Sequence, residues 1–148
     1  MAHAQLSPSS AVRWMTCPGS VALCKDLPNT SSKYADEGTD AHELAAICLT
    51  PPGCKAADHI GRTMTEGHVV DADMAAHVQR YVDYVVDIAA AGVFFVEQKL
   101  DISGITGEKD AHGTSDAVVI EGDELCVVDL KYGMGEPVEA DNNPQLMI

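Results

Sequence analysis

Two short acidic motifs carry the residue types of a hydrolytic metal site. Asp116 ends the tract Gly113-Thr114-Ser115-Asp116, and Asp129 and Lys131 form an Asp-x-Lys motif. Carboxylate oxygens suit hard cations such as Mg²⁺ and Mn²⁺. An ammonium beside such a cation can position or help deprotonate a water, and it can stabilise charge that develops on a phosphate.

A hairpin between the motifs would bring the two acids together. Residues 117–120 and 125–128 are short β-favouring runs, and Gly122-Asp123 between them is typical of a two-residue turn. This turn pairs Ile120 with Leu125 and, continued outward, places Asp116 opposite Asp129.

Directly opposed residues of an antiparallel pair have Cβ atoms roughly 4.5–5.5 Å apart. Two carboxylates at that distance repel each other unless a cation lies between them, so Asp116 and Asp129 are predicted metal ligands. Lys131 follows Asp129 by two residues and leaves the strand on the same face. The alternative to a metal site is a solvated strand end with a salt bridge, and the predicted register favours the metal site. A β-bulge in either strand would break this register.

Glu97 is a candidate third acid. It lies in the run Val93–Leu100, which is otherwise mostly hydrophobic and predicts another strand. If this strand neighbours Asp116, Glu97 could join the cluster or orient a ligand. The alternative is an ordinary glutamate on the solvent face of the strand.

The motifs together resemble a nuclease family. Gly113-Thr114-x-Asp116, Asp129-x-Lys131 and a helix opened by Gln145 resemble the RecB-like branch of the PD-(D/E)XK nuclease superfamily, and the chain is similar to its uncharacterised phage-encoded members. Gly38-Thr39-Asp40-Ala41-His42 resembles the branch's G-x-x-x-H element. The opening segment 7–18, with Ser-x-Ser and Cys-Pro, resembles its N-terminal helix.

The resemblance implies a role for each matching residue. His42, Asp116, Asp129 and the carbonyl of Leu130 would bind Mg²⁺ or Mn²⁺, and Lys131 would be the catalytic lysine. Asp116, Asp129, Lys131 and Glu97 are the predicted catalytic residues, while Gln145, Thr114 and Arg13 are the predicted substrate-binding residues. The implied reaction is exonuclease-like hydrolysis of a DNA phosphodiester in phage recombination or replication.

One departure concerns the C-terminus. The Q-x-x-x-Y motif that Gln145 begins needs a tyrosine one position beyond Ile148, where the sequence stops. We therefore expect one nuclease-like domain over residues 1–148 that lacks its C-terminal helix and strand. A protein partner or an oligomer could complete that part of the fold.

The net charge of −14 opposes tight DNA binding by this chain alone. Residues 1–62 carry five Lys/Arg and six Asp/Glu, whereas residues 63–148 carry four and seventeen. Generic DNA binding needs a basic surface. The basic residues of the N-terminal half could form a local phosphate-facing surface, although scattered solvated charges are the alternative. These residues are Arg13, Lys25, Lys33, Lys55 and Arg62. Two other functions stay open: an acidic protein-binding module derived from a nuclease, and a Mg²⁺-dependent phosphohydrolase acting on small nucleotides.

The five cysteines do not suggest a disulfide framework. Their odd number is typical of a reduced compartment. Cys48 and Cys126 are predicted small core residues. A zinc site built from Cys17, Cys24, Cys54 and His59 is not expected because no C-x-x-C pair exists. Some RecB-like nucleases, which this chain resembles, hold an iron–sulfur cluster with one N-terminal and three C-terminal cysteines. That trio is absent here, so no such cluster is expected.

The predicted elements give an α/β fold with a restriction-endonuclease-like core, in which helices flank a mixed central sheet. Helices are expected from Ser9 or Ser10 to about Leu23, with an interruption near Pro18-Gly19, over 36–49, over 71–91 and from Pro144. Strands are expected over 93–101, 112–120 and 125–131, with irregular segments over 53–70 and 101–111. No apolar run reaches the roughly 18 residues of a membrane span. With no signal peptide recognisable, a cytoplasmic protein is expected, in the host cytoplasm if phage-encoded.

Overall fold

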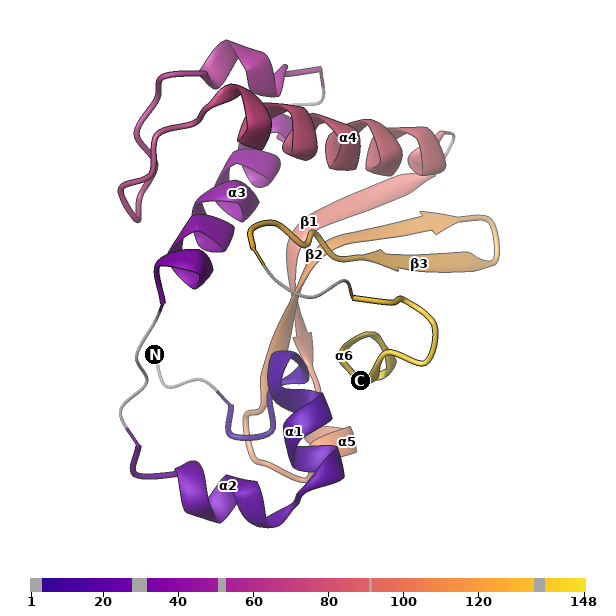
Figure 1. Cartoon of the computed structure of the whole chain (residues 1–148). Coiled ribbons are helices and arrows are strands. Elements are labelled where there is room, and N and C mark those ends of the chain that lie inside the picture. Colours follow the sequence, from indigo (N-terminus) through magenta and orange to yellow (C-terminus); the bar gives the residue numbers. More distant parts are fainter. Residues whose placement is uncertain (1–3, 28–31, 51–52, 91, 135–137) are drawn as a thin grey trace. The chain divides into compact units, whose positions relative to one another are not determined.

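The computed structural model of the chain describes residues 4–27, 32–50, 53–90, 92–134 and 138–148. Its contacts divide the chain into two units (Figure 1). The first unit comprises Met1–Thr30, Lys99–Thr114 and Pro137–Ile148, and the second comprises Ser31–Gln98 and Ser115–Glu136. A single nuclease-like domain over the whole chain stays a prediction.

The first unit contains short helices: η1 (Pro8–Ser10), α1 (Ala11–Thr16), α2 (Gly19–Cys24), α5 (Ser103–Thr106) and α6 (Pro144–Met147). The predicted interruption near Pro18 is confirmed. The segment expected to be an irregular loop over 101–111 instead contains α5. Asp101 starts this turn, because its Oδ1 accepts hydrogen bonds from the Ser103 backbone N–H at 2.8 Å and hydroxyl at 2.6 Å. Gly107 ends it with a φ of 72°.

Three helices of the second unit support the site: α3 (Lys33–Leu49), the 3₁₀ helix η2 (Ala56–His59) and α4 (Ala72–Ala89). α3 begins where the Ser32 side chain accepts the Ala35 N–H, and α4 where the Asp71 side chain accepts the Met74 N–H. The predicted apolar stripe of α4 is confirmed for Met74, Val78, Tyr81, Val82 and Val85, whereas Ile88 is only half-buried. α3 ends at Leu49. The predicted end of this helix at Pro51-Pro52 and that of the next at Ala91 lie outside the described residues.

The strands form a three-stranded antiparallel sheet in the order β1 (Val93–Asp101), β2 (His112–Glu121) and β3 (Glu124–Val128). The predicted hairpin register is confirmed, since Ile120 pairs with Leu125 and Ala117 with Val128. Gly122 has a φ of 58°, as a tight hairpin turn requires. β3 ends at Val128 rather than at residue 131. A mixed sheet would need a further strand, which the described residues do not contain.

The hydrophobic core of the second unit lies between α3, α4 and the sheet. Ala117 and Val119 of β2 are buried in it, and Phe94 and Val96 of β1 pack against it. Figure 1 shows α3 and α4 close to each other beside the strands. Cys48 is buried in this core as predicted. Cys126 is exposed, so its predicted burial was wrong: β3 turns that side chain to solvent.

Gly92, between α4 and β1, leaves no room for a side chain. A Cβ at this position would overlap the backbone carbonyl oxygen of Ile120 and would lie 3.2 Å from the Cα of Glu121. We expect Gly92→Ala to lower the free energy of unfolding by about 1–3 kcal/mol, because β2 would have to move. Urea denaturation measures this effect. Gly19→Ala is the control, since no atom lies within 4 Å of the added Cβ; an equal loss in both variants would contradict the expectation.

Candidate metal centre

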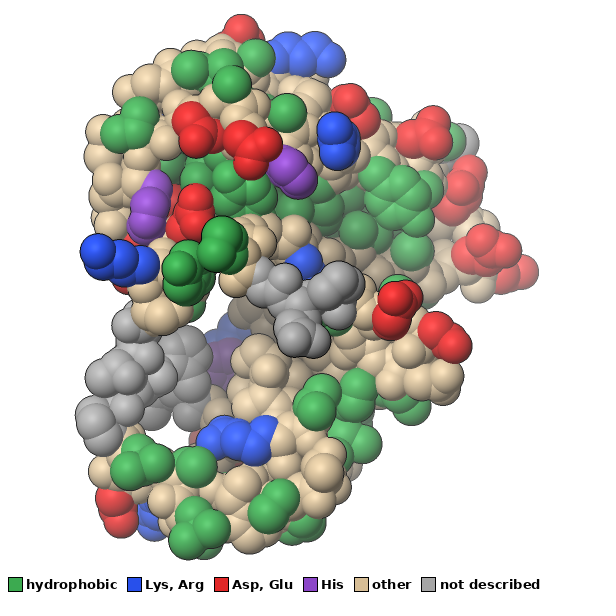
Figure 2. All heavy atoms as spheres, viewed as in Figure 1, with side chains coloured by type: hydrophobic (Ala, Val, Ile, Leu, Met, Phe, Trp, Pro, Cys, Tyr) green, Lys and Arg blue, Asp and Glu red, His purple; other side chains and the backbone are tan. Residues whose placement is uncertain are grey.

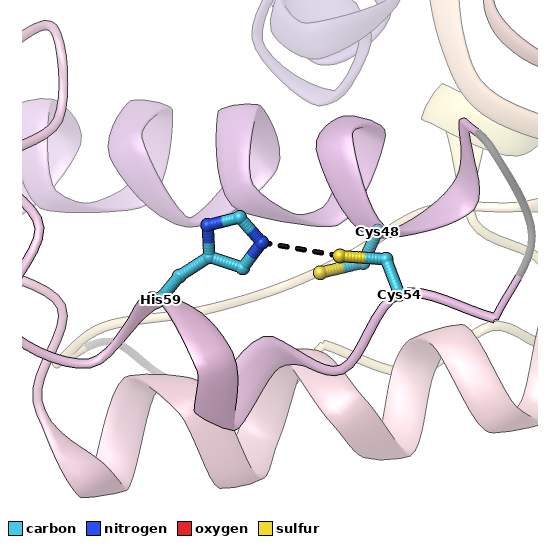
Figure 3. A group of neighbouring side chains, drawn as sticks. All are labelled: Cys48, Cys54 and His59. Carbon is cyan, nitrogen blue, oxygen red and sulfur yellow. Dashed lines mark hydrogen bonds between the residues drawn. The ribbon is translucent and has the colours of Figure 1, made fainter.

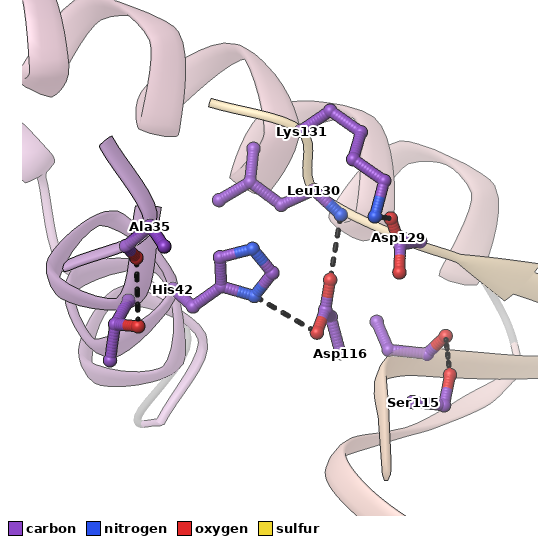
Figure 4. Close-up of polar contacts among 9 residues, drawn as sticks. Ala35, His42, Ser115, Asp116, Asp129, Leu130 and Lys131 are labelled. Atoms are coloured by element: carbon purple, nitrogen blue, oxygen red, sulfur yellow. Dashed lines mark hydrogen bonds and ion pairs between the residues drawn. The ribbon is translucent and has the colours of Figure 1, made fainter. Parts of the chain in front are cut away.

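His42 projects from α3 towards β2. On this helix its neighbours Asp40, Ala41 and Leu44 are buried, whereas His42 is half-buried. Its Nδ1 lies 3.0 Å from Oδ1 of Asp116 (Figure 4). The histidine and acid of the two predicted motifs therefore meet in space, although 74 residues separate them in the sequence.

Asp116 uses its two carboxylate oxygens for different partners. Oδ1 faces His42, and Oδ2 accepts a hydrogen bond from the Leu130 backbone N–H at 2.7 Å. The β2–β3 ladder has its last pair at Ala117 and Val128, so Asp116 and Asp129 lie just past it. The Asp116 side chain thus holds the chain beyond β3 in place where the backbone ladder has ended.

Glu97 joins the other two residues from β1. One ligand atom each from His42, Glu97 and Asp116 lie within 4.8 Å of one another. Glu97 has a φ of 51°, which is unusual for a residue other than glycine. The burial pattern of β1 nevertheless alternates through this position, and Glu97 is exposed, as are Val93 and Phe95. The strained backbone is the kind of feature that accumulates at functional sites.

Asp129 and Lys131 form an ion pair beside this group. Nζ of Lys131 lies 2.5 Å from Oδ2 of Asp129, whose side chain is 15% exposed (Figure 4). The Asp129 oxygens are not part of the group within 4.8 Å, but its charge acts on the His42 imidazole. The amine of Lys131 therefore lies next to Asp129, as predicted. Leu130, between these two residues, is buried, and its N–H is directed to Asp116.

The electrostatics of the site favour positive charge. The hydrogen bond to Asp116 raises the pKa of His42, burial opposes this, and the charges of Asp116, Asp129 and Glu97 raise it further. Burial, followed by the charge of Asp116, raises the pKa of Glu97, while His42 lowers it. The negative charges of Glu97 and Asp116 thus repel each other beside one imidazole. A divalent cation that accepts His42, Glu97 and Asp116 as ligands would relieve this repulsion.

Tyr81, which the sequence analysis assigned only to the core, has its hydroxyl in the field of the acid cluster. Its side chain on α4 is 8% exposed, and its hydroxyl has no hydrogen-bond partner in the described part of the chain. Burial and the charges of Asp116, Asp129 and Glu97 raise the pKa of this hydroxyl. A buried, unsatisfied hydroxyl beside an acid cluster is costly unless a ligand or a water uses it. The helical spacing of Tyr81 predicts its burial but gives no information about the partners of its hydroxyl.

A shallow cleft lies next to Lys131. It has a volume of about 240 Å³. Its lining residues are Glu37, Asp73, His77, Lys131, Tyr132, Gly133 and Met134. The His77 and Tyr132 rings meet edge to face at 5.6 Å and form part of the wall. Lys131 therefore borders both this cleft and, through its ion pair with Asp129, the group of acids.

The predicted substrate-binding residues belong to the first unit. Arg13 and Thr114 are exposed, and Gln145 is half-buried at the start of α6, where its N–H donates to the Asn143 side chain. The predicted helix start at Asn143-Pro144 is confirmed. The role of these three residues in substrate binding stays a prediction.

No helix among the described residues has both the length and the apolar character needed to cross a membrane.

Comparison with known proteins gives a family but no solved relative. No solved structure matches the chain. A family model described as "Protein of unknown function (DUF2800)" matches residues 3–148. Because this match spans nearly the whole sequence, the chain belongs to the DUF2800 family.

Proposed function

We propose that this chain is a metal-dependent DNA nuclease with a restriction-endonuclease-like core, related to the RecB-like branch of the PD-(D/E)XK superfamily. One observation carries the proposal: His42, Glu97 and Asp116 converge from α3, β1 and β2 to within 4.8 Å, and the Asp129–Lys131 ion pair lies beside them. One imidazole and two carboxylates are a ligand set for Mg²⁺ or Mn²⁺. An amine next to such a set is what phosphodiester hydrolysis needs.

Each residue has a distinct proposed role. His42, Glu97 and Asp116 hold the cation, with Asp129 and the Leu130 carbonyl completing its ligands. The bound cation would supply Lewis-acid stabilisation of charge on the phosphate. Lys131 positions the attacking water and stabilises the developing charge, and Asp129 orients Lys131 through their ion pair. Gln145, Thr114 and Arg13 contact the DNA.

The proposal extends to biological role. Exonuclease-like cleavage in phage recombination or replication, in the cytoplasm of a host cell, fits the motifs of the sequence. The acidic surface disfavours tight non-specific DNA binding, so a protein partner or an oligomer would supply further DNA contacts.

The decisive experiment is a cleavage assay on labelled single- and double-stranded DNA with Mg²⁺ or Mn²⁺. We expect cleavage that EDTA abolishes. Lys131→Ala should lower the rate by at least about 100-fold and keep Mn²⁺ binding, because the amine serves the reaction and not the cation. Lys109→Ala, an exposed lysine of the first unit, is the matched control. Mn²⁺ binding without DNA cleavage by the wild-type chain would contradict the nuclease proposal, and hydrolysis of nucleotides alone would indicate the phosphohydrolase.

Tyr81→Phe tests whether the buried hydroxyl serves the site. We expect the free energy of unfolding to stay equal or to rise by about 1 kcal/mol, because an unsatisfied buried group disappears. Mn²⁺ affinity or cleavage should fall about tenfold, the value of one lost hydrogen bond to a bound water or substrate. Chemical denaturation and Mn²⁺ titration measure the two effects. Loss of stability with unchanged Mn²⁺ affinity and cleavage would assign Tyr81 to the core alone.

The acidic surface favours one second candidate, a non-catalytic module that binds a basic protein. Exposed acids occur on α4 (Asp73, Asp83 and Asp87) and at the hairpin (Glu121, Asp123 and Glu124). Figure 2 shows acidic side chains over this region. Salt-sensitive binding of a basic partner that Lys131→Ala leaves unchanged, together with absent cleavage, would support this function.

A further inference from the structure

A second cluster of metal-binding side chains lies away from the carboxylates. One ligand atom each of Cys48, Cys54 and His59 are within 4.8 Å of one another. Sγ of Cys54 lies 3.1 Å from Nε2 of His59, and the sulfur of Cys48 lies beside that of Cys54 (Figure 3). The cluster brings two sulfurs and one imidazole nitrogen to the same point.

Secondary structure holds two of the three side chains. Cys48 is on the last turn of α3 and is fully buried, and His59 ends η2. η2 is anchored in turn to α4, because the buried Ala56 donates its backbone N–H to Oε1 of Gln79 at 2.9 Å. Cys54 lies between α3 and η2 and is half-buried. Two of the three ligand atoms are therefore held by secondary structure, which favours a metal site.

We propose that Cys48, Cys54 and His59 form a Zn²⁺ site. Thiolate and imidazole ligands select Zn²⁺ over Mg²⁺ or Mn²⁺, so this site and the carboxylate site take different ions. Three protein ligands leave the fourth tetrahedral position to water. Bound Zn²⁺ would cross-link the end of α3, through Cys48, to η2, through His59. It would also cross-link Cys48 to Cys54.

Zn²⁺ binding must displace the thiol protons of the cluster, because the thiolate is the metal ligand. The bound cation favours this charged form of each thiol.

Coordination of the ion requires His59 to change its tautomer. A guanidinium nitrogen of Arg62 lies 3.4 Å from its Nδ1, which therefore accepts, and Nε2–H faces Cys54. Coordination through Nε2 moves the proton to Nδ1, and Arg62 must turn away. Arg62 is exposed, so its side chain can do so at little cost.

Titration of the reduced full-length chain with Co²⁺, followed by displacement with Zn²⁺, tests the proposal. We expect thiolate-to-cobalt charge-transfer absorption that saturates at one ion per chain and disappears when Zn²⁺ is added. One equivalent of Zn²⁺ should also raise the thermal midpoint of unfolding. Cys54→Ser and His59→Ala should each weaken Zn²⁺ binding at least tenfold; neither residue is fully buried, so both variants should fold.

Two controls separate this site from other metal binding. Cys126→Ser removes an exposed thiol on β3 and should leave the absorption unchanged, as should Asp116→Asn at the carboxylate site. Absence of thiolate absorption at stoichiometric Co²⁺, or absorption that Cys54→Ser does not change, would overturn the proposal and leave Cys48 as a core residue hydrogen-bonded to its neighbour.

Discussion

Asp116→Asn is expected to abolish Mn²⁺ binding at the carboxylate site and to lower DNA cleavage by at least about 100-fold. The two Asp116 oxygens serve different partners, the His42 imidazole at 3.0 Å and the Leu130 N–H at 2.7 Å. An asparagine keeps the shape but loses the negative charge, and its NH₂ group faces one of these partners. The cation would then lose the one ligand that also fixes His42 and the segment after β3.

Calorimetric titration with Mn²⁺ measures the binding, and circular dichroism confirms that the variant is folded. Asp123→Asn is the matched control, since Asp123 is an exposed aspartate in the turn of the same hairpin. Wild-type Mn²⁺ affinity together with wild-type cleavage in Asp116→Asn would remove Asp116 from the proposed mechanism. Retained affinity with lost cleavage would place Asp116 in the reaction rather than at the ion.

The part of this site that the sequence predicted correctly depends on local rules. Gly122 provides the positive φ of a tight turn, and the apolar runs on both sides can pair in a single register. The ladder ends at Ala117 and Val128, so the pairing of Asp116 with Asp129 as metal ligands stays a prediction. The proximity of Lys131 to Asp129 follows from their spacing. The meeting of His42 with Asp116 is a contact between distant segments, and its prediction came from the family resemblance.

The backbone conformation of Glu97 could not be read from the sequence. Strict alternation would direct Glu97 away from Phe94 and Val96, which face the core. Glu97 has a positive φ that no glycine marks in the sequence, while the exposure pattern of the strand continues to alternate through it. The sequence therefore makes Glu97 a candidate member of the acid cluster only if its strand lies next to the strand of Asp116.

Tyr81 and the cysteine cluster were missed for different reasons. Apolar helical spacing correctly predicts that Tyr81 is buried, but it carries no information on whether the hydroxyl is satisfied. Cys48, Cys54 and His59 lack the C-x-x-C spacing that marks many zinc sites. Their approach depends on how η2 packs after the end of α3, in a segment that the sequence predicted to be irregular.

Asp40→Asn is expected to lower the free energy of unfolding by about 1–3 kcal/mol. The Asp40 carboxylate is fully buried. Oδ1 accepts the Glu66 N–H at 2.7 Å, and Oδ2 accepts the His68 N–H at 3.0 Å and lies 2.8 Å from Nδ1 of the His68 ring. An asparagine replaces one acceptor by a donor, so at least one of these N–H groups would lose its partner inside the fold.

The same replacement should change the acid sensitivity of the fold. Burial alone would raise the pKa of Asp40, but hydrogen bonds from Glu66 and His68 outweigh it and hold the pKa below its ordinary value of 3.8. Asp40 therefore contributes stability above pH 3.8 that is lost as the pH falls towards the lowered pKa. Asp40→Asn should flatten the loss of stability in this range. Asp87→Asn, an exposed acid of α4, should follow the wild-type curve.

Asp40 and His42 lie two positions apart on α3, so their side chains leave the helix on different faces. Asp40 holds the segment around Glu66, whereas His42 faces the carboxylates. The folded fraction of Asp40→Asn should therefore bind Mn²⁺ with nearly wild-type affinity, in contrast to Asp116→Asn. Urea denaturation from pH 3 to pH 7, followed by Mn²⁺ titration at pH 7, measures both effects. An unchanged denaturation midpoint and acid slope would contradict a structural role for the Asp40 carboxylate, and lost Mn²⁺ binding in the folded variant would assign it to the metal centre.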